Sequence, residues 1–175
     1  MNNNLNNVNL NNFKKTIEEA KVDPGTSKKT IHIEGDWKTE EGLQFKAEIK
    51  TPKGNFTIEA DEPDFLGGNT LAPSPVHYCI FGGIACYTAS FAKWAAIEGI
   101  TLKNLRIKAD AKMDLSKAYG ISDNSIMESL VWEITTETTA TREELNKVKQ
   151  LADERCPALY CLKRIIDVTT IITSK

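Results

Sequence analysis

The 175-residue sequence lacks a strong excess of charge of either sign. It contains 22 Lys and Arg against 24 Asp and Glu, for a formal net charge of −2. Nucleic-acid-binding proteins carry a basic surface, because neutralising phosphates drives their association. We therefore expect no nucleic-acid partner. The length suits one domain with an extension, and it is sufficient to bury a real core.

The sequence also lacks an apolar leader. It opens with an asparagine-rich tract that has no hydrophobic stretch of the kind found in secretory signals. We therefore expect a cytoplasmic protein. Thiols are kept reduced in the cytoplasm and permanent disulfides are rare there, so unpaired cysteines become candidates for catalysis or redox sensing.

Signatures of cofactor and metal binding are missing as well. Gly67-Gly68 and Gly82-Gly83 do not have the spacing of a nucleotide-binding loop. The spacings between the four cysteines differ from those of zinc knuckles. We expect no cofactor and no metal. The four cysteines are Cys79, Cys86, Cys156 and Cys161.

One long uncharged run, residues 75–92, approaches the ~20 apolar residues that a membrane span requires. Polar residues such as His77 dilute it, and Lys93 and Glu98 follow within the same helical pattern. We predict a buried core helix and no membrane partner. Ser74 and Pro75 form its predicted start, and Gly99 marks its predicted end.

The remaining patterns predict a segregated α+β fold, because strands come in groups on either side of this helix. The sequence predicts an antiparallel three-stranded meander before it, and two strands, a capped helix and a closing strand after it. The first 27 residues, with a short helix at 12–22, form a predicted asparagine-rich extension to a domain at 28–175. The predicted strands are residues 31–33, 43–49, 56–60, 105–113, 130–134 and 166–172, and the capped helix runs from Thr141 to Arg155.

Cys156 has the strongest physical claim to reactivity. It directly precedes Pro157, a residue that typically begins a helix, and the positive end of a helix favours thiolate over thiol. The neighbouring Arg155 favours the same form. Structural alternatives stay open: Cys156 as a helix cap, Cys86 as a small buried hydrophobe. Cys79 lies two helical turns before Cys86, roughly 10 Å along the axis, and cannot bond it directly.

Five short motifs occur in a fixed order along the chain and together resemble the OsmC/organic hydroperoxide resistance family. The resemblance covers about residues 28–175. It implies an OsmC-like α+β fold, with antiparallel sheets wrapped around two long central helices, in an intertwined homodimer whose active site lies at the subunit interface. The motifs are Asp61-Glu62-Pro63, Leu66-Gly67-Gly68, Ala72-Pro73-Ser74-Pro75, Ala85-Cys86 and Cys156-Pro157.

The resemblance also implies a chemistry. Cys86 matches the cysteine that attacks an organic hydroperoxide and becomes a sulfenic acid, and Cys156 matches the cysteine that resolves it as a disulfide. A cellular dithiol then reduces the disulfide. The implied partners are thus a second copy of the chain, an organic hydroperoxide or other small hydrophobic substrate, and a dithiol reductant.

The sequence departs from the peroxidase members of the family at two supporting positions. Those members use an arginine from the N-terminal sheet and a glutamate in the first turn of the central helix, whereas this chain has no arginine before Arg106 and has Val76 and His77 at the helix start. Lys38 is the nearest cationic residue in the predicted N-terminal sheet region. Its ammonium group cannot form the paired hydrogen bonds that an arginine guanidinium makes with a carboxylate. We take Lys38, His77 and Cys79 as candidate supporting residues.

Two alternatives to a peroxidase follow from this departure. The first is an OsmC-fold dimer with weak or no peroxidase activity that binds a hydrophobic ligand in the interface pocket. The second is thiol chemistry on another electrophile, such as persulfide or acyl transfer through Cys86.

Overall fold

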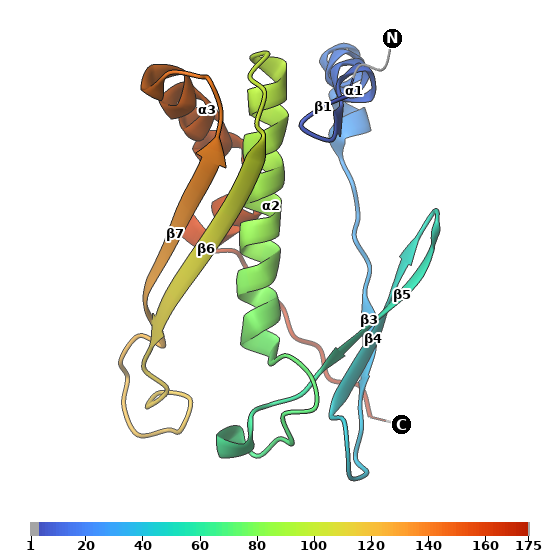
Figure 1. Cartoon of the computed structure of the whole chain (residues 1–175). Helices are drawn as coiled ribbons and strands as arrows, with labels where there is room; N and C mark the ends of the chain where they lie inside the picture. The colour runs from blue at the N-terminus through green and yellow to red at the C-terminus, as the bar shows by residue number, and fades with distance from the viewer. Residues whose placement is uncertain (1–3, 175) are drawn as a thin grey trace. The chain divides into compact units, whose positions relative to one another are not determined.

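A computed structural model describes residues 4–174 of the chain. It is a mixed α+β structure with small antiparallel sheets and four α-helices among the described residues (Figure 1), so the predicted fold class is confirmed at that level. In chain order, the elements are β1 (Asn4–Leu5), β2 (Val8–Asn9), α1 (Leu10–Val22), η1 (Pro24–Ser27), β3 (Glu34–Trp37), β4 (Phe45–Thr51), β5 (Gly54–Ala60), η2 (Asp64–Leu66), α2 (Pro75–Ile97), β6 (Asn104–Met113), β7 (Met127–Glu137), α3 (Arg142–Arg155) and α4 (Pro157–Lys163).

The chain divides into two compact units, which are described separately. One holds Asn12–Phe81, and the other holds the remainder of the described residues. This division does not test the predicted boundary at residue 27 between an N-terminal extension and a domain, which stays a prediction. The predicted short helix at 12–22 is present as α1, which begins two residues earlier, at Leu10.

The first unit contains the predicted meander, with antiparallel strand order β3-β4-β5. The turn between β4 and β5 contains Gly54 at a φ of +140°, a backbone conformation that favours glycine. The first strand was predicted at 31–33 and lies instead at Glu34–Trp37. Its pairing with β4 ends at Glu34 opposite Glu48, and Ile31 before it is 86% exposed. The alternation of isoleucines therefore gave the wrong position for this strand. An isoleucine gains little from an extended backbone when no apolar side chains pack against it.

The loop after β5 closes around one buried carboxylate. Asp61 is 1% exposed, and its Oδ2 accepts hydrogen bonds from the backbone amides of Asn69, at 3.3 Å, and Leu71, at 2.9 Å. Gly68 lies so near the chain that a Cβ there would meet the Glu62 carbonyl oxygen at 1.8 Å. Two of the five motifs therefore shape this loop.

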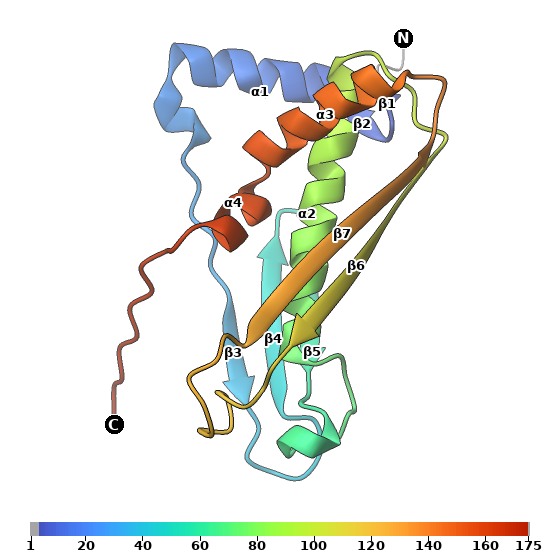
Figure 2. The same cartoon turned by 90° about the vertical axis from the view of Figure 1, so that its left-hand side faces the viewer.

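The second unit is built on the β6–β7 hairpin, which runs alongside α2 (Figure 1), while α3 crosses the C-terminal part of that helix (Figure 2). Both predicted strands are confirmed, and inward-facing residues alternate with exposed ones along them. The capping box at Thr141 is present and begins α3. The core of the unit consists of Tyr87, Phe91, Ala95, Ile100, Val148, Ala152 and Cys156.

Helix α2 begins and ends as predicted. The His77 amide donates to Ser74 Oγ at 3.4 Å, and Gly99 adopts a φ of +75° just after the helix. Among the described helices, α2 alone is long and apolar enough to cross a bilayer by length and composition, and 33% of its apolar window is buried in the structure. Phe81 on this helix is 63% exposed. Burial of the helix within a single chain is thus less complete than its composition predicted.

The predicted closing strand at 166–172 is wrong. The chain forms no regular structure after α4 within the described residues, and the isoleucines there are exposed. A strand requires a neighbouring strand for its backbone hydrogen bonds. The β-branched residues of this segment find no such neighbour in the single chain.

The asparagine-rich start contributes one ordered feature to the second unit. Asn6 and Asn7 both have positive φ, which lets β1 and β2 form a tight hairpin. The Asn6 side chain donates to the Ile100 carbonyl at 2.9 Å and accepts from the Leu102 amide at 2.8 Å. The hairpin is thereby fastened to the loop that joins α2 to β6.

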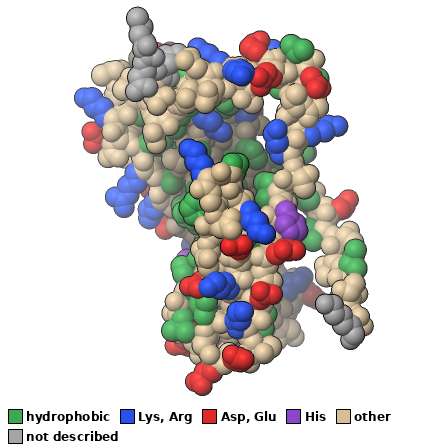
Figure 3. All heavy atoms as spheres, turned by 90° about the vertical axis from the view of Figure 1, so that its right-hand side faces the viewer, with side chains coloured by type: hydrophobic (Ala, Val, Ile, Leu, Met, Phe, Trp, Pro, Cys, Tyr) green, Lys and Arg blue, Asp and Glu red, His purple; other side chains and the backbone are tan. Residues whose placement is uncertain are grey.

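Acidic and basic side chains are interspersed over the molecular face drawn in Figure 3. Exposed ion pairs of the chain include Lys46 with Glu59 and Lys108 with Asp110. This face has the balance of charge expected from the composition.

Candidate thiol site

Two cysteines that lie 70 residues apart in the sequence meet in the second unit. The Sγ atoms of Cys86 and Cys156 are 3.7 Å apart. Cys86 lies on the middle turns of α2 and is half-buried, whereas Cys156 is 1% exposed at the junction of α3 and α4. Both are free thiols. The arrangement places a partly accessible thiol directly against a buried one.

The junction between α3 and α4 positions Cys156. Pro157 stops α3 and occupies the first position of α4, so Cys156 caps both helices. Its Sγ accepts a hydrogen bond from the Leu159 amide at 3.4 Å. The Ala158 amide of the same turn is directed to Cys86 Sγ. The first turn of α4 thus supplies one backbone donor to each sulfur.

Burial raises the pKa of the Cys86 thiol, and the neighbouring Cys156 sulfur adds to the increase. The Ala158 amide and the positive charge of Lys93 oppose this rise without cancelling it. Cys86 therefore rests as a thiol near neutral pH. A proton must leave it before it can act as a nucleophile.

A hydrogen-bonded chain of polar residues lies beside the thiol pair. The Tyr87 hydroxyl donates to Asp153 Oδ1 at 2.5 Å, and Lys149 donates to Asp153 Oδ2, also at 2.5 Å. Burial and the carboxylate together raise the pKa of Tyr87, so its hydroxyl stays protonated. Burial acts to raise the pKa of Asp153, but the bonds from Lys149 and Tyr87 lower it overall.

Sequence reasoning did not identify this chain of contacts. Tyr87 directly follows Cys86, and Asp153 precedes Cys156 by three residues. That proximity to both cysteines was the available signal. Only the packing of α3 against α2 shows that the two residues meet.

Arg155 was predicted to favour the ionised form of Cys156. Its guanidinium instead lies over the ring of Trp94, 4.3 Å from the ring centroid. Such a stack is a common use of arginine. The groups that contact the sulfurs are backbone amides.

The remaining predicted residues make other contacts or are exposed. Lys38 and His77 belong to the first unit, where the Lys38 amide donates to the Gln44 carbonyl and His77 Nδ1 bonds Ser74 Oγ at 2.7 Å. Cys79 is exposed on α2, and Cys161 is exposed on α4. Roles for Lys38, His77 and Cys79 stay predictions. Within residues 4–174, no three potential metal-ligating side chains come together.

The profile of the family described as OsmC-like protein matches residues 67–171 of the chain. This stretch includes both cysteines of the close pair and most of the second unit. The chain belongs to the OsmC-like family. The resemblance seen in the short motifs is thereby confirmed.

Solved structures show the same fold. An OsmC-like protein of Mycoplasma pneumoniae aligns with a TM-score of 0.59 at 16% identity, over 77% of this chain and 88% of that one. An organic hydroperoxide resistance protein of Legionella pneumophila aligns at 0.54 and 18% identity, over 77% and 90%. An OsmC-like protein of Vibrio cholerae aligns at 0.56 and 15% identity, over 76% and 93%. No curated protein matched the chain.

Proposed function

We propose that this OsmC-like protein is a thiol-dependent reductase of organic hydroperoxides that acts in oxidative-stress defence. The observation that carries the proposal is the 3.7 Å separation between the Sγ atoms of Cys86 and Cys156. The name of the Legionella pneumophila relative, an organic hydroperoxide resistance protein, supports the same class of substrate. The half-buried thiol has the accessibility that the attacking residue needs.

The proposed reaction has three balanced steps. The Cys86 thiolate attacks the terminal peroxide oxygen, the O–O bond breaks, and the alcohol leaves after taking up a proton, with the sulfur oxidised to sulfenic acid. The Cys156 thiol then attacks that sulfur, forming a disulfide and releasing water. A cellular dithiol reduces the disulfide and becomes oxidised in exchange.

The packing around the sulfurs favours the second step. Cys156 is buried and held by the Leu159 amide, so the resolving sulfur is already next to the attacking one. Little chain movement is needed to join them. A sulfenic acid that meets a thiol at once is protected from further, irreversible oxidation.

The raised pKa of Cys86 favours a second candidate function. With burial as its main cause and Lys93 as the one positive charge acting on it, the thiol lacks a strongly activating group among the described residues. In this alternative, the protein keeps the OsmC fold with weak or no peroxidase activity and binds a hydrophobic ligand in the interface pocket. The speed of Cys86 oxidation distinguishes the two functions.

We further propose a cytoplasmic homodimer in which sheets wrap around the two long α2 helices. Exposed apolar and small residues on α2, including Phe81, Ala85 and Ala89, support this assembly. A second copy would cover these residues, which a helix of this composition otherwise leaves in water. In this proposal α2 packs against protein and not against lipid.

Rapid mixing of the reduced protein with cumene hydroperoxide tests the reductase proposal. We expect fast loss of two thiols, an intact mass lower by two hydrogen atoms, and a Cys86–Cys156 disulfide in the peptide map. Cys86→Ser should abolish the reaction, whereas Cys156→Ser should accumulate a sulfenic acid that dimedone traps. Cys79→Ser and Cys161→Ser are matched controls, because both residues are exposed cysteines.

Slow oxidation of all four cysteines at similar rates would contradict the reductase proposal and favour the binding protein. Equal rates for cumene hydroperoxide and hydrogen peroxide would contradict the preference for an organic substrate. We expect a dithiol such as dihydrolipoamide to reduce the disulfide efficiently, and a monothiol to reduce it poorly.

A further inference from the structure

A cavity of about 620 Å³ lies in the second unit between β7 and helices α2, α3 and α4. Its volume falls within the ~300–1,000 Å³ typical of small-molecule sites. Neither Cys86 nor Cys156 lines it, although Tyr87, Asp153 and Leu159 beside them do, so it adjoins the thiol site without including the sulfurs. Apolar side chains form much of its wall, including Phe91, Leu130, Trp132, Ile134, Leu159 and Leu162.

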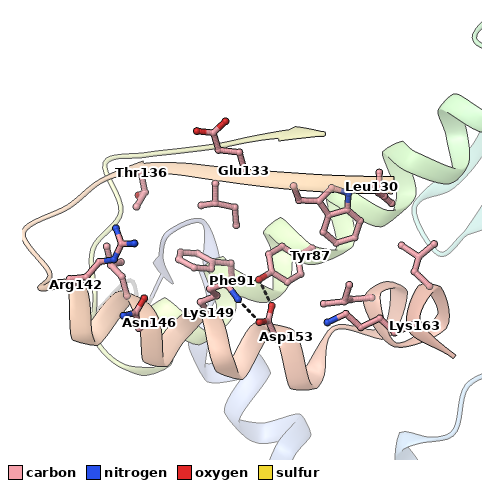
Figure 4. Close-up of a pocket in the computed structure, with 15 residues that line it drawn as sticks. Tyr87, Phe91, Leu130, Glu133, Thr136, Arg142, Asn146, Lys149, Asp153 and Lys163 are labelled. Carbon is pink, nitrogen blue, oxygen red and sulfur yellow. Dashed lines mark hydrogen bonds and ion pairs between the residues drawn. The ribbon is translucent and has the colours of Figure 1, made fainter. Parts of the chain in front are cut away.

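The charged residues of the cavity are not equally available to a ligand. Asp153 is bonded to Lys149 and Tyr87, and Lys163 adds a further positive influence on it. Glu133 carries its carboxylate on the far side of β7 from α3 (Figure 4). The acidic groups are thus either neutralised or directed away.

Lys163 lines the cavity without a hydrogen bond or ion pair among the described residues, and its charge acts on Asp153. Arg142 is the second cavity cation without such a partner. Its guanidinium points from the first turn of α3 toward β7 near Thr136, at one end of the cavity (Figure 4). Within residues 4–174 it has no carboxylate or other side-chain partner, and the Asn146 side chain beside it also has none. An arginine fork and a carboxamide donor therefore lie at one end of a pocket that also has apolar walls and the Lys149–Asp153 pair.

Trp132 lines the cavity, and its indole has an unsatisfied donor inside the described part of the protein. Its indole Nε1 is buried and has no hydrogen-bond partner among the described residues. Buried polar groups in native structures are nearly always bonded. Because this nitrogen is buried, it is not a donor to a ligand in the cavity.

We propose that this cavity binds an amphipathic carboxylate with one unbranched alkyl chain. The guanidinium of Arg142 pairs with the carboxylate through two parallel hydrogen bonds, with Asn146 as a further donor. The alkyl chain lies along the apolar wall formed by β7 and α4, where its burial is favourable. The site is one of binding alone, because no thiol reaches it.

Titration of the full-length reduced protein with carboxyl-¹³C dodecanoate tests the proposal below the micelle concentration. We expect saturable binding of one molecule per chain and a bound carboxyl signal that titrates at lower pH than the free acid, because the guanidinium stabilises the carboxylate. Arg142→Gln should weaken dodecanoate binding roughly tenfold to hundredfold. The same variant should leave the affinity for dodecanol unchanged.

Arg106→Gln is the matched control, since Arg106 is an exposed arginine on β6 that lines a different cavity. It should bind dodecanoate as tightly as the natural sequence. Equal loss in both variants would overturn the assignment to Arg142, because it would indicate general charge attraction. Absence of saturable binding by the natural sequence would overturn the site itself.

Alkylation of the thiols separates this proposal from the proposed reductase. Iodoacetamide treatment should abolish peroxide reduction and leave dodecanoate binding intact. Loss of binding on alkylation would mean that the chain of the ligand occupies the thiol site, which contradicts a separate cavity. Thermal unfolding of each variant confirms that it is folded.

Discussion

Oxidation of the thiol pair should make the protein markedly harder to unfold. A Cys86–Cys156 bond would close a loop of 70 residues, from the sequence separation of the two cysteines. The chain-entropy relation then gives a stabilisation of about 4 kcal/mol at 25 °C. Because the sulfurs already lie 3.7 Å apart, little native-state strain should offset it.

Urea unfolding measures this difference directly. Circular dichroism would follow the reduced protein in dithiothreitol and the protein oxidised with one equivalent of cumene hydroperoxide, at one fixed concentration. For a chain of this size, ~4 kcal/mol corresponds to a melting temperature higher by roughly 8–16 °C. The same treatment should not raise the stability of Cys86→Ser. It should raise the stability of Cys79→Ser as much as that of the natural sequence.

The reasoning would be refuted if mass spectrometry found the Cys86–Cys156 disulfide but the oxidised protein were no more stable than the reduced protein. That outcome would mean that the bond distorts the native packing, and that the close approach of Cys86 and Cys156 does not prepare them for joining. A gain that persists in Cys86→Ser would show that another pair of cysteines had reacted.

Three further predictions concern the thiol site and helix α3 that leads to it. Tyr87→Phe should lower the free energy of unfolding by about 1–2 kcal/mol, because Asp153 loses a charge-assisted hydrogen bond. Alkylation of Cys86 by iodoacetamide should speed up as pH rises above the ordinary thiol value of ~8.5, because burial raises its pKa. Thr141→Ala should cost about 1 kcal/mol, since it removes the capping box of α3 with Glu144.

Each of these has its own check by chemical denaturation or mass spectrometry. The double variant Tyr87→Phe/Asp153→Asn should lose less unfolding free energy than the sum of the losses in the two single variants. Strictly additive losses would contradict the contact between the two side chains. An alkylation rate that is flat from about pH 7 to 10 would contradict the raised pKa. Thr141→Ser keeps the capping oxygen and should stay near the natural stability.

The same pKa shift gives a pH dependence of stability with a definite sign. The native state holds the Cys86 proton more tightly than the unfolded chain does, so this contribution is complete below the unfolded pKa. It is lost as pH rises from the unfolded value through the higher native value. Unfolding measured across that alkaline range should show a steeper loss in the natural sequence than in Cys86→Ser.

Features that depend on a few neighbouring residues could be predicted from the sequence. The capping box at Thr141, the helix start at Ser74-Pro75 and the stop at Gly99 all rest on backbone geometry that side chains set locally. The alternation in β6 and β7 was equally clear, because one face of that hairpin is packed on α2.

Errors arose where distant neighbours decide the outcome. The isoleucines near residues 31 and 170 have the composition of strands, yet neither group finds a pairing partner at those positions in the chain. Arg155 looked like a partner for Cys156 because it is adjacent, but the Trp94 ring is placed to receive it. Adjacency in sequence does not specify which way a long side chain turns.

The sequence by itself determined the two reactive residue types, the helices that carry them and the family to which the chain belongs, because these depend on local pattern. Only the tertiary structure decided that Cys86 and Cys156 touch, that Tyr87 meets Asp153, and that Arg142 faces a cavity unpaired. The physical reason is that such contacts come from the packing of α3 against α2 across 60 to 70 residues of chain. No local pattern encodes that distance.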